Sequence, residues 1–361
     1  MFITIVAIVV VLSVVILIHE VGHFVSAKKT GTKVEEFGIG YPPRIFGVKK
    51  GDTLYSINWI PFGGFVKIKG SEGADDHEGE ADSFVEKPIW QRALMLGGGV
   101  VMNFILAIIL LSIAYMIGSP GYVGGEIDQS AQVTEEKIQV LTVEEGFPAK
   151  DAGFQAGDAI VSINGNEFTN TDELNLHNQG RGNQEIIVVL NRDNELIETK
   201  LTLTQNDEGK GVMGVTLVET GLIRYPFFKS IWLGFKDTFL FVWIMLKFLY
   251  SLIRDLLVGK SVAGEITGPI GVAFLTSKVV KLGMNYVLQF TAIISINLGL
   301  FNLLPFPALD GSRLVFLGIE KIRRKRVSMK VENMFHTIGF GLLIILSIFI
   351  AVKDWQRFFG K

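Results

Sequence analysis

The sequence predicts a polytopic α-helical membrane protein with four transmembrane helices and two extramembrane parts. Apolar residues make up 49% of its 361 residues. Apolar runs near the roughly 20 residues that a spanning helix needs occur at Phe2–Ile18, Ala93–Ile117, Tyr286–Leu304 and Thr337–Val352. Segments of ordinary soluble composition separate these runs. A formal net charge of −2 and the lack of a long basic block argue against nucleic acid as a partner.

The runs and the segments between them predict an order of parts along the chain. In sequence these are a first spanning helix at 1–28, a cytoplasmic β-region with an acidic loop at 29–91, a second spanning helix at 92–118, an extracytoplasmic domain at 119–222, an interfacial amphipathic helix region at 223–284, a third spanning helix at 285–318, a basic cytoplasmic loop at 319–332, and a fourth spanning helix with the C-terminus at 333–361. The chain has no cysteine, which excludes disulfides and thiolate metal ligands.

Flanking charges predict how the chain threads the membrane. No basic residue precedes the first run, whereas Lys28, Lys29 and Lys33 follow it. The positive-inside rule then places the N-terminus outside. The alternative is a cleaved signal peptide, but the first run lacks both a basic start and an obvious small-x-small cleavage site. The most basic stretch, Glu320–Lys330, is expected to be cytoplasmic.

One apolar stretch, Ile231–Ile253, is ambiguous. By hydropathy alone it is able to span, yet several of its polar residues, including Lys236 and Lys247, fall close to one helical face. This pattern favours an amphipathic helix that lies on the membrane surface. If this segment does not span, the following helix ends inside at the basic stretch. We therefore predict four spanning helices with both termini outside.

The cytoplasmic segment Lys33–Gly70 contains three runs of β-type residues separated by Gly, Pro and Lys-Gly turns. It predicts a small β-sheet or a pair of hairpins. Within it, the apolar sequence PFGGF carries Gly63 and Gly64 and is suited to approach the bilayer. The acidic segment Ser71–Asp82 predicts a mobile loop.

The extracytoplasmic segment Gly125–Thr220 is mostly strand-like. Its clearest signature is GFPAKDAGFQAGDAIVSING, Gly146 to Gly165: a short helix at Ala149–Ala152, a Gly-Asp turn, a strand at Ala159–Ile163 and an Asn-Gly turn. This sequence resembles a PDZ domain. The resemblance implies capture of peptide C-termini or of an extended peptide by strand addition. The alternative is a β-rich spacer without a ligand.

The motif that carries chemistry is His19-Glu20-Val21-Gly22-His23 inside the first apolar run. Residues at i and i+4 lie on one helix face, with Cβ atoms about 5–6 Å apart. Both imidazoles can therefore reach one zinc ion. The intervening Glu20 lies beside the metal and can take a proton from water. Ionisable groups at membrane depth usually have a functional reason.

A catalytic zinc ion needs a third protein ligand. In the predicted topology Asp310, in the sequence NLLPFPALDGSR, lies near the cytoplasmic end of its helix, at a depth similar to that of the two histidines. His336 begins the last helix at a comparable depth and remains the alternative ligand. Pro305 and Pro307 are expected to break the helix just before Asp310. Broken backbone at membrane depth fits a cavity that admits water.

Together these motifs resemble the site-2 protease family of intramembrane zinc metalloproteases, and most closely the bacterial regulator-of-sigma-E protease group. HEVGH matches the zinc helix of the family, and Asn302-x-x-Pro305-x-Pro307-x-Leu309-Asp310-Gly311 matches its second motif. Gly268-Pro269-Ile270-Gly271 matches a Gly-Pro pattern before the third helix. Two positions depart from the family: Ser312 replaces a second glycine, and Val100 stands where proline is common.

The resemblance implies one Zn²⁺ held by His19, His23 and Asp310, with Glu20 as the catalytic acid and base. It implies substrate contacts for Asn297, Asn302, Pro305, Pro307, Gly63 and Gly64. From the residues alone, the two asparagines are equally suited to simple interhelix hydrogen bonds. The length of 119–222 allows one PDZ-like domain.

The expected function is therefore that of a multi-pass zinc endopeptidase of a bacterial inner or plasma membrane. Its expected partners are the lipid bilayer and single-span membrane proteins, such as anti-sigma factors and remnant signal peptides, which it cleaves. The alternative from another class is a non-enzymatic membrane scaffold that carries a PDZ-like module and a vestigial metal site.

Overall fold

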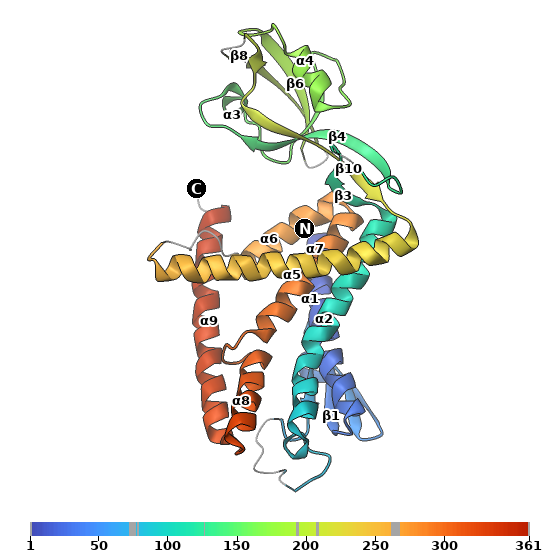
Figure 1. Ribbon diagram of the computed structural model, residues 1–361, viewed down its shortest axis with the longest axis vertical. Coiled ribbons are helices and arrows are strands. Elements are labelled where there is room, and N and C mark those ends of the chain that lie inside the picture. Colours follow the sequence, from blue (N-terminus) through green and yellow to red (C-terminus); the bar gives the residue numbers. More distant parts are fainter. Residues whose placement is uncertain are drawn as a thin grey trace. The chain divides into compact units, whose positions relative to one another are not determined.

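The computed structural model describes residues 2–71, 77, 79–125, 127–192, 195–206, 209–260 and 268–359. The chain forms two compact units. The first comprises Met1–Ser112, Ile231–Val280 and Val287–Lys361, and the second comprises Ile113–Ser230 with Lys281–Tyr286. Figure 1 gives the course of the chain.

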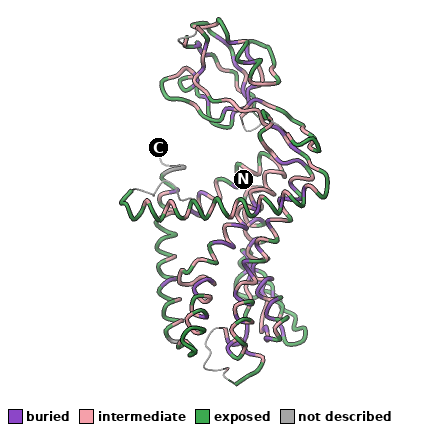
Figure 2. Tube along the Cα trace, in the orientation of Figure 1, coloured by how far each residue is buried: buried purple, intermediate pink, exposed green. Residues whose placement is uncertain are grey.

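Four helices in the described residues are long and apolar enough to cross a membrane. They are α1 (Phe2–Lys29), α2 (Ile89–Ile117), α7 (Met284–Leu303) and α9 (Met329–Phe359). The four apolar runs of the sequence therefore correspond to the four candidate spans. Helix α9 is exposed along most of its length (Figure 2), which fits a helix that contacts lipid.

Helix α5 (Phe227–Leu257) is one unbroken helix of 31 residues. It contains the ambiguous segment Ile231–Ile253 and is not among the four candidate spans found in the described residues. In the first unit it runs across the direction of α2 and α9 rather than along it (Figure 1). Gly234 allows close contact with α2, since a Cβ there would lie 2.3 Å from Ser112 Oγ. A short α6 (Pro269–Leu282) precedes α7.

A two-stranded antiparallel hairpin, β1 (Val34–Lys50) and β2 (Thr53–Ile68), follows α1. Both strands bend, so that Phe37 pairs with Val66 and also with Tyr55. The predicted β-region is thus one hairpin of two long strands. The 3-10 helix η2 (Phe84–Glu86) leads into α2. Within the predicted acidic loop, residues 72–76 and 78 lie outside the described residues.

The segment around Asp310 differs from the predicted third spanning helix at 285–318, because it consists of two helices joined by an irregular segment. Helix α7 ends at Leu303, residues 304–309 are irregular, and α8 runs from Asp310 to Arg323. The two prolines end α7 as predicted, because proline cannot donate the backbone hydrogen bond that would continue a helix. The predicted basic loop at 319–332 is wrong over its first part. Residues up to Arg323 are helical, and Arg324 ends the helix in a left-handed conformation, with φ 52°.

The second unit is a β-rich module built on a six-stranded antiparallel sheet with the order β3-β10-β4-β5-β6-β7. Its strands are β3 (Ser119–Tyr122), β4 (Gln132–Val143), β5 (Ala159–Ile163), β6 (Glu185–Arg192), β7 (Glu195–Thr202) and β10 (Val215–Arg224). A smaller sheet pairs β8 (Thr204–Gln205) with β9 (Gly211–Val212). Helices α3 (Pro148–Asp151) and α4 (Thr171–His177) complete it.

The local predictions for this module hold closely. Strand β5 has the predicted bounds, and the predicted short helix is displaced by one residue because Pro148 begins it, a position that proline favours. Gly157 and Gly165 adopt φ of 99° and 79° in the two predicted turns. The core contains Ile138, Ile163, Leu174 and Leu190, all about 1% exposed or less.

Candidate metal centre

Helix α1 presents His19 and His23 on one face, as their spacing predicts. Their rings meet edge to face, with centroids 4.7 Å apart, and the two Nε2 atoms are 3.1 Å apart. Both residues are buried, at 5% and 8% exposure. The two nitrogen atoms therefore point at one place inside the first unit.

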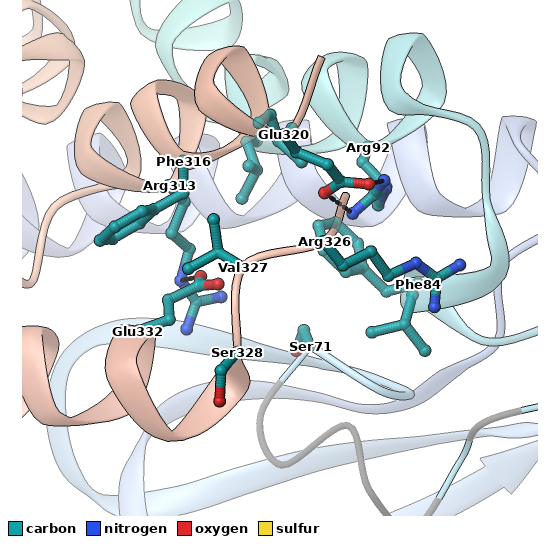
Figure 3. Close-up of a pocket in the computed structure, with 13 residues that line it drawn as sticks. Ser71, Phe84, Arg92, Arg313, Phe316, Glu320, Arg326, Val327, Ser328 and Glu332 are labelled. Carbon is teal, nitrogen blue, oxygen red and sulfur yellow. Dashed lines mark hydrogen bonds and ion pairs between the residues drawn. The ribbon is translucent and has the colours of Figure 1, made fainter. Parts of the chain in front are cut away.

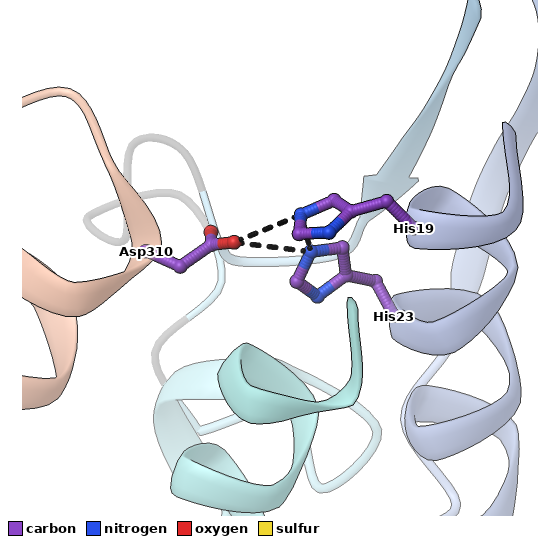
Figure 4. A group of neighbouring side chains, drawn as sticks. All are labelled: His19, His23 and Asp310. Atoms are coloured by element: carbon purple, nitrogen blue, oxygen red, sulfur yellow. Dashed lines mark hydrogen bonds and ion pairs between the residues drawn. The ribbon is translucent and has the colours of Figure 1, made fainter. Parts of the chain in front are cut away.

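The third donor comes from almost 300 residues further along the chain. Asp310 is the first residue of α8. Its Oδ2 lies 3.1 Å from His19 Nε2 and 3.3 Å from His23 Nε2 (Figure 4). The irregular segment before it turns the carboxylate toward α1. Its backbone includes Ala308 in a left-handed conformation with φ 73°, and the Ala308 N–H donates to His336 Nδ1 at 3.0 Å.

The three donor atoms fit zinc. Zn²⁺ binds imidazole nitrogen and carboxylate oxygen at about 2.0–2.1 Å, so that tetrahedral geometry places neighbouring donors about 3.3 Å apart. The observed separations of 3.1, 3.1 and 3.3 Å agree with that value. Gly99 on α2 faces the same place, because a Cβ there would lie 2.6 Å from both Nε2 atoms. A glycine at this position therefore leaves room for an ion.

The close approach of α1 and α2 depends on small residues. A Cβ on Gly22 would lie 2.2 Å from the Gly98 carbonyl oxygen, and one on Gly98 would lie 2.6 Å from the Gly22 oxygen. Contacts of this kind bring helix backbones together in membranes. As a result, α2 supplies partners to both imidazoles. His23 Nδ1 is 2.8 Å from the Met95 carbonyl, and His19 Nδ1 is 3.2 Å from the Asn103 side chain.

Glu20 lines a cavity of about 460 Å³ that also contains the three donors. The hairpin forms another wall of this cavity through Tyr41, Phe65 and Val66. The backbone N–H of Val66 lies beside the Glu20 carboxylate. An acid next to the donors, in a cavity with a polar lining, is placed to exchange protons with a bound water or substrate.

The other predicted site residues lie around this cavity at different distances. Asn302 lines it, with Nδ2 3.5 Å from His19 Nε2. Asn297 lies on the same helix, half-buried, next to the lining residue Leu298. Pro305 and Pro307 lie in the irregular segment between α7 and α8.

The two predicted glycines of the hairpin press β2 against α1. A Cβ on Gly63 would lie 2.6 Å from Ile16 Cγ2, and one on Gly64 would lie 3.1 Å from Leu17 Cδ1. Gly63 also needs its positive φ of 66°. These contacts bring the following residues of β2, Phe65 and Val66, to the cavity wall.

His336, the alternative third ligand, also lines the cavity. Its Nδ1 is occupied by the Ala308 N–H, and its Nε2 is buried without a hydrogen-bond partner among the described residues. Glu332 Oε1 is 3.9 Å from that nitrogen. The geometry therefore groups Asp310, not His336, with the two histidines of α1.

Ion pairs near both ends of α8, the helix that carries Asp310, tie it to neighbouring helices (Figure 3). Arg92 of α2 forms a bidentate ion pair with Glu320, with N–O distances of 2.9 and 2.5 Å. Both side chains are largely buried, at 8% and 13% exposure. Arg313, one turn after Asp310, lies 3.8 Å from Glu332 of α9. Paired geometry of this kind restricts how α8 slides or rotates.

The sequence reasoning did not identify Met95, Gly99, Asn103 or Arg313 as parts of the site. The signal for two of them, Gly99 and Asn103, is present in the run GGGVVMN, where three glycines and an asparagine interrupt an apolar segment. Polar and small residues inside a membrane helix mark close helix contacts. The identity of their partner helix was not readable from that signal.

Two histidines, an adjacent glutamate and a distant aspartate share one cavity in a bundle of apolar helices. This is the donor set of a metallopeptidase. The chain belongs to peptidase family M50, whose model matches residues 7–346. It is a zinc metalloprotease of the site-2 protease type, and its cofactor is zinc. This assignment favours the enzyme over the scaffold alternative.

Relatives over nearly the whole chain carry names that agree with this assignment. A Clostridium perfringens protein, provisionally named a zinc metalloprotease, is 32% identical over 95% of this chain and 95% of its own length. The regulator of sigma-W protease RasP of Bacillus subtilis is 28% identical over 99% of each chain. The crystal structure of a PDZ domain from an SdrC-like protein of Listeria monocytogenes covers 24% of this chain and 92% of its own, at 25% identity and a TM-score of 0.22.

Proposed function

We propose that this chain cleaves single-span membrane proteins within or near the bilayer, with anti-sigma-factor-like proteins and remnant signal peptides as its substrates. The single observation that carries the proposal is the convergence of His19, His23 and Asp310 at 3.1–3.3 Å beside Glu20, on helices of membrane-like composition. The regulator of sigma-W protease named above supports the choice of anti-sigma-factor-like substrates.

In the proposed mechanism, His19, His23 and Asp310 hold the zinc ion. When bound, zinc supplies Lewis-acid polarisation of the scissile carbonyl and lowers the pKa of water. Glu20 accepts the proton of the attacking water and then donates it to the leaving amine. This double role needs a carboxylate that lies beside the metal without binding it. Glu20 fits this role because it directly follows the ligand His19 in the chain.

A helical substrate must unwind before cleavage, because its carbonyls are hydrogen-bonded within the helix. We propose that β2 and Asn302 hold the unwound segment. The cavity wall at Phe65 and Val66 brings strand backbone next to Glu20, and the Asn302 amide lies within 3.5 Å of His19. Asn297, Pro305 and Pro307 would shape the same region, and Gly63 and Gly64 would keep β2 in place.

The β-rich module is proposed to act outside the membrane as a PDZ-like sensor or size filter. Its motif at Gly146–Gly165 and its short helix and strand follow the PDZ-like prediction. Peptide C-termini or an extended peptide are the proposed ligands. Such a module would let the protease act after another enzyme has shortened the substrate.

Metal removal tests the proposed function directly. Purified protein with one zinc ion per chain should cleave a single-span anti-sigma-like substrate whose extracytoplasmic domain has been removed. Chelation to below a tenth of an ion per chain should abolish cleavage, and added Zn²⁺ should restore it. Gel analysis of the fragments and elemental analysis of the protein measure both quantities. Undiminished cleavage by the metal-free protein would refute the proposal.

The proposed location is a bacterial inner or plasma membrane, with both termini outside and α5 on the membrane surface. Ser328, between α8 and α9, and Asn166, in the β-rich module, are both exposed. In intact cells, Ser328→Cys should be shielded from an impermeant thiol reagent and Asn166→Cys should be labelled. The chain has no cysteine, so labelling has no background. Labelling at position 328 would mean that Ile231–Ile253 spans the membrane.

A further inference from the structure

The two imidazoles of α1 each have a second nitrogen that faces α2. For His23 this is Nδ1, which donates to the Met95 carbonyl at 2.8 Å. A carbonyl oxygen only accepts, so the proton of neutral His23 must be on Nδ1. Its Nε2 then keeps a lone pair, which a metal ligand requires. The hydrogen-bond partner of Nδ1, the nitrogen that faces α2, thus decides whether Nε2 can bind a metal ion.

His19 has the corresponding partner in Asn103. Its Nδ1 lies 3.2 Å from the amide of Asn103, which is fully buried on α2. In the structure the amide nitrogen Nδ2 of Asn103 faces the ring. In that orientation His19 Nδ1 would have to accept a hydrogen bond from Nδ2, so the proton of neutral His19 would be on Nε2. That proton would point at the other donors and block ligation. The same orientation leaves Asn103 Oδ1 buried without a donor among the described residues.

A rotation of the Asn103 amide frees His19 Nε2 for a metal ion and also gives the buried Oδ1 a hydrogen-bond donor. Turning the amide by 180° about its Cβ–Cγ bond places Oδ1 opposite His19 Nδ1. The buried oxygen then receives the N–H that it lacked, and His19 Nε2 is left free for the metal. The backbone of Asn103 is itself held in place, since Ser295 Oγ donates to its carbonyl at 2.8 Å. Gly299 lies against its Cβ, with no room for a large side chain between them.

We infer that Asn103 is the positioning residue of His19: its Oδ1 accepts from Nδ1–H and thereby keeps Nε2 unprotonated for zinc. The inference rests on the proposed ligand role of His19. Asn103 touches neither substrate nor metal and acts through the imidazole. Partners of this kind contribute about 10–100-fold to metal affinity.

Two near-isosteric substitutions separate an acceptor from a donor. Asn103→Leu removes both, whereas Asn103→Asp keeps an acceptor and has no N–H to donate when ionised. The zinc dissociation constant of the full-length protein in detergent, measured against a competing chelator, should rise about 10–100-fold for Asn103→Leu. It should stay within about threefold of the parent for Asn103→Asp. Ser112→Ala is the matched control, a buried polar-to-apolar change further along α2 that should leave the constant unchanged.

Each pattern of results decides the question. Weak binding by both Asn103 variants would mean that the amide donates or only packs, and tight binding by Asn103→Leu would mean that no partner is needed. Either result overturns the inference. If His19→Ala keeps its zinc, the proposed metal site fails instead, so the two failures are distinguishable.

A spectroscopic measurement keeps the inference testable if Asn103→Leu does not fold. The chain has five histidines, so ¹⁵N-histidine labelling gives few signals, and the His19 signal is assigned by its loss in His19→Gln. In the zinc-loaded parent protein, the His19 Nδ1–H signal should show a strong hydrogen bond, and it should shift in Asn103→Asp. A signal that is the same in both proteins would overturn the inference.

Discussion

Glu20→Gln should abolish cleavage while the protein keeps one zinc ion per chain. Glutamine has nearly the same shape as glutamate but cannot take up and return a proton. The side chain lies in the cavity beside the three donors and is not one of them. General acid–base catalysis contributes about 10²–10⁴-fold, and a loss of at least that size in kcat is expected. Elemental analysis and single-turnover cleavage of one substrate measure the two effects.

The matched control is Glu35→Gln, the same chemical change on strand β1. Glu35 pairs with Lys67 at 2.9 Å, and its side chain is 29% exposed. Losing a partly exposed ion pair costs about 0–1 kcal/mol, so cleavage and zinc content should stay near those of the parent protein. If Glu20→Gln retained more than a few per cent of the activity, Glu20 would not be the general base. If it lost zinc as well, Glu20 would be a ligand.

The spacing of residues along the chain is sufficient to predict two of the three donors of the metal centre. His19 and His23 are four residues apart on one helix, so the helix geometry alone brings their Nε2 atoms together. The break before Asp310 was also readable, because Pro305 and Pro307 act on their own backbone. The same holds for β5 and its turns in the β-rich module, where Gly157 and Gly165 are required by the backbone conformation.

The rest of the metal centre depends on how helices meet, which a single sequence does not encode locally. Asp310 was reached only through topology and a family resemblance, since nothing within ten residues of it points to α1. Met95 and Asn103 contact the imidazoles because Gly22 and Gly98 allow α1 and α2 to touch in one register. A shift by one residue would present different side chains. The sequence predicts a loop at residues 319–323, the last part of α8, because the basic residues there resemble a membrane flank.

Asp310 and His336 both line the cavity, and only one of them is the proposed third ligand. Asp310 reaches both imidazole nitrogens at 3.1 and 3.3 Å, whereas His336 uses Nδ1 to hold the Ala308 N–H. A carboxylate also offsets part of the zinc charge in a medium of low dielectric constant, which a neutral imidazole cannot do. Asparagine keeps the shape of Asp310 and removes that charge. The two side chains should therefore respond very differently to substitution.

Asp310→Asn should raise the zinc dissociation constant by more than about 100-fold, beyond the 10–100-fold usual for an indirect partner, and should eliminate cleavage. His336→Ala removes one hydrogen bond to the neighbouring loop, worth about 1 kcal/mol. It should keep one zinc ion per chain and lower the affinity by less than about tenfold. Chelator competition and elemental analysis measure both, with the same substrate for cleavage. Loss of zinc in His336→Ala together with its retention in Asp310→Asn would reverse the ligand assignment. Helix α9, rather than α8, would then have to approach α1 in the metal-bound protein.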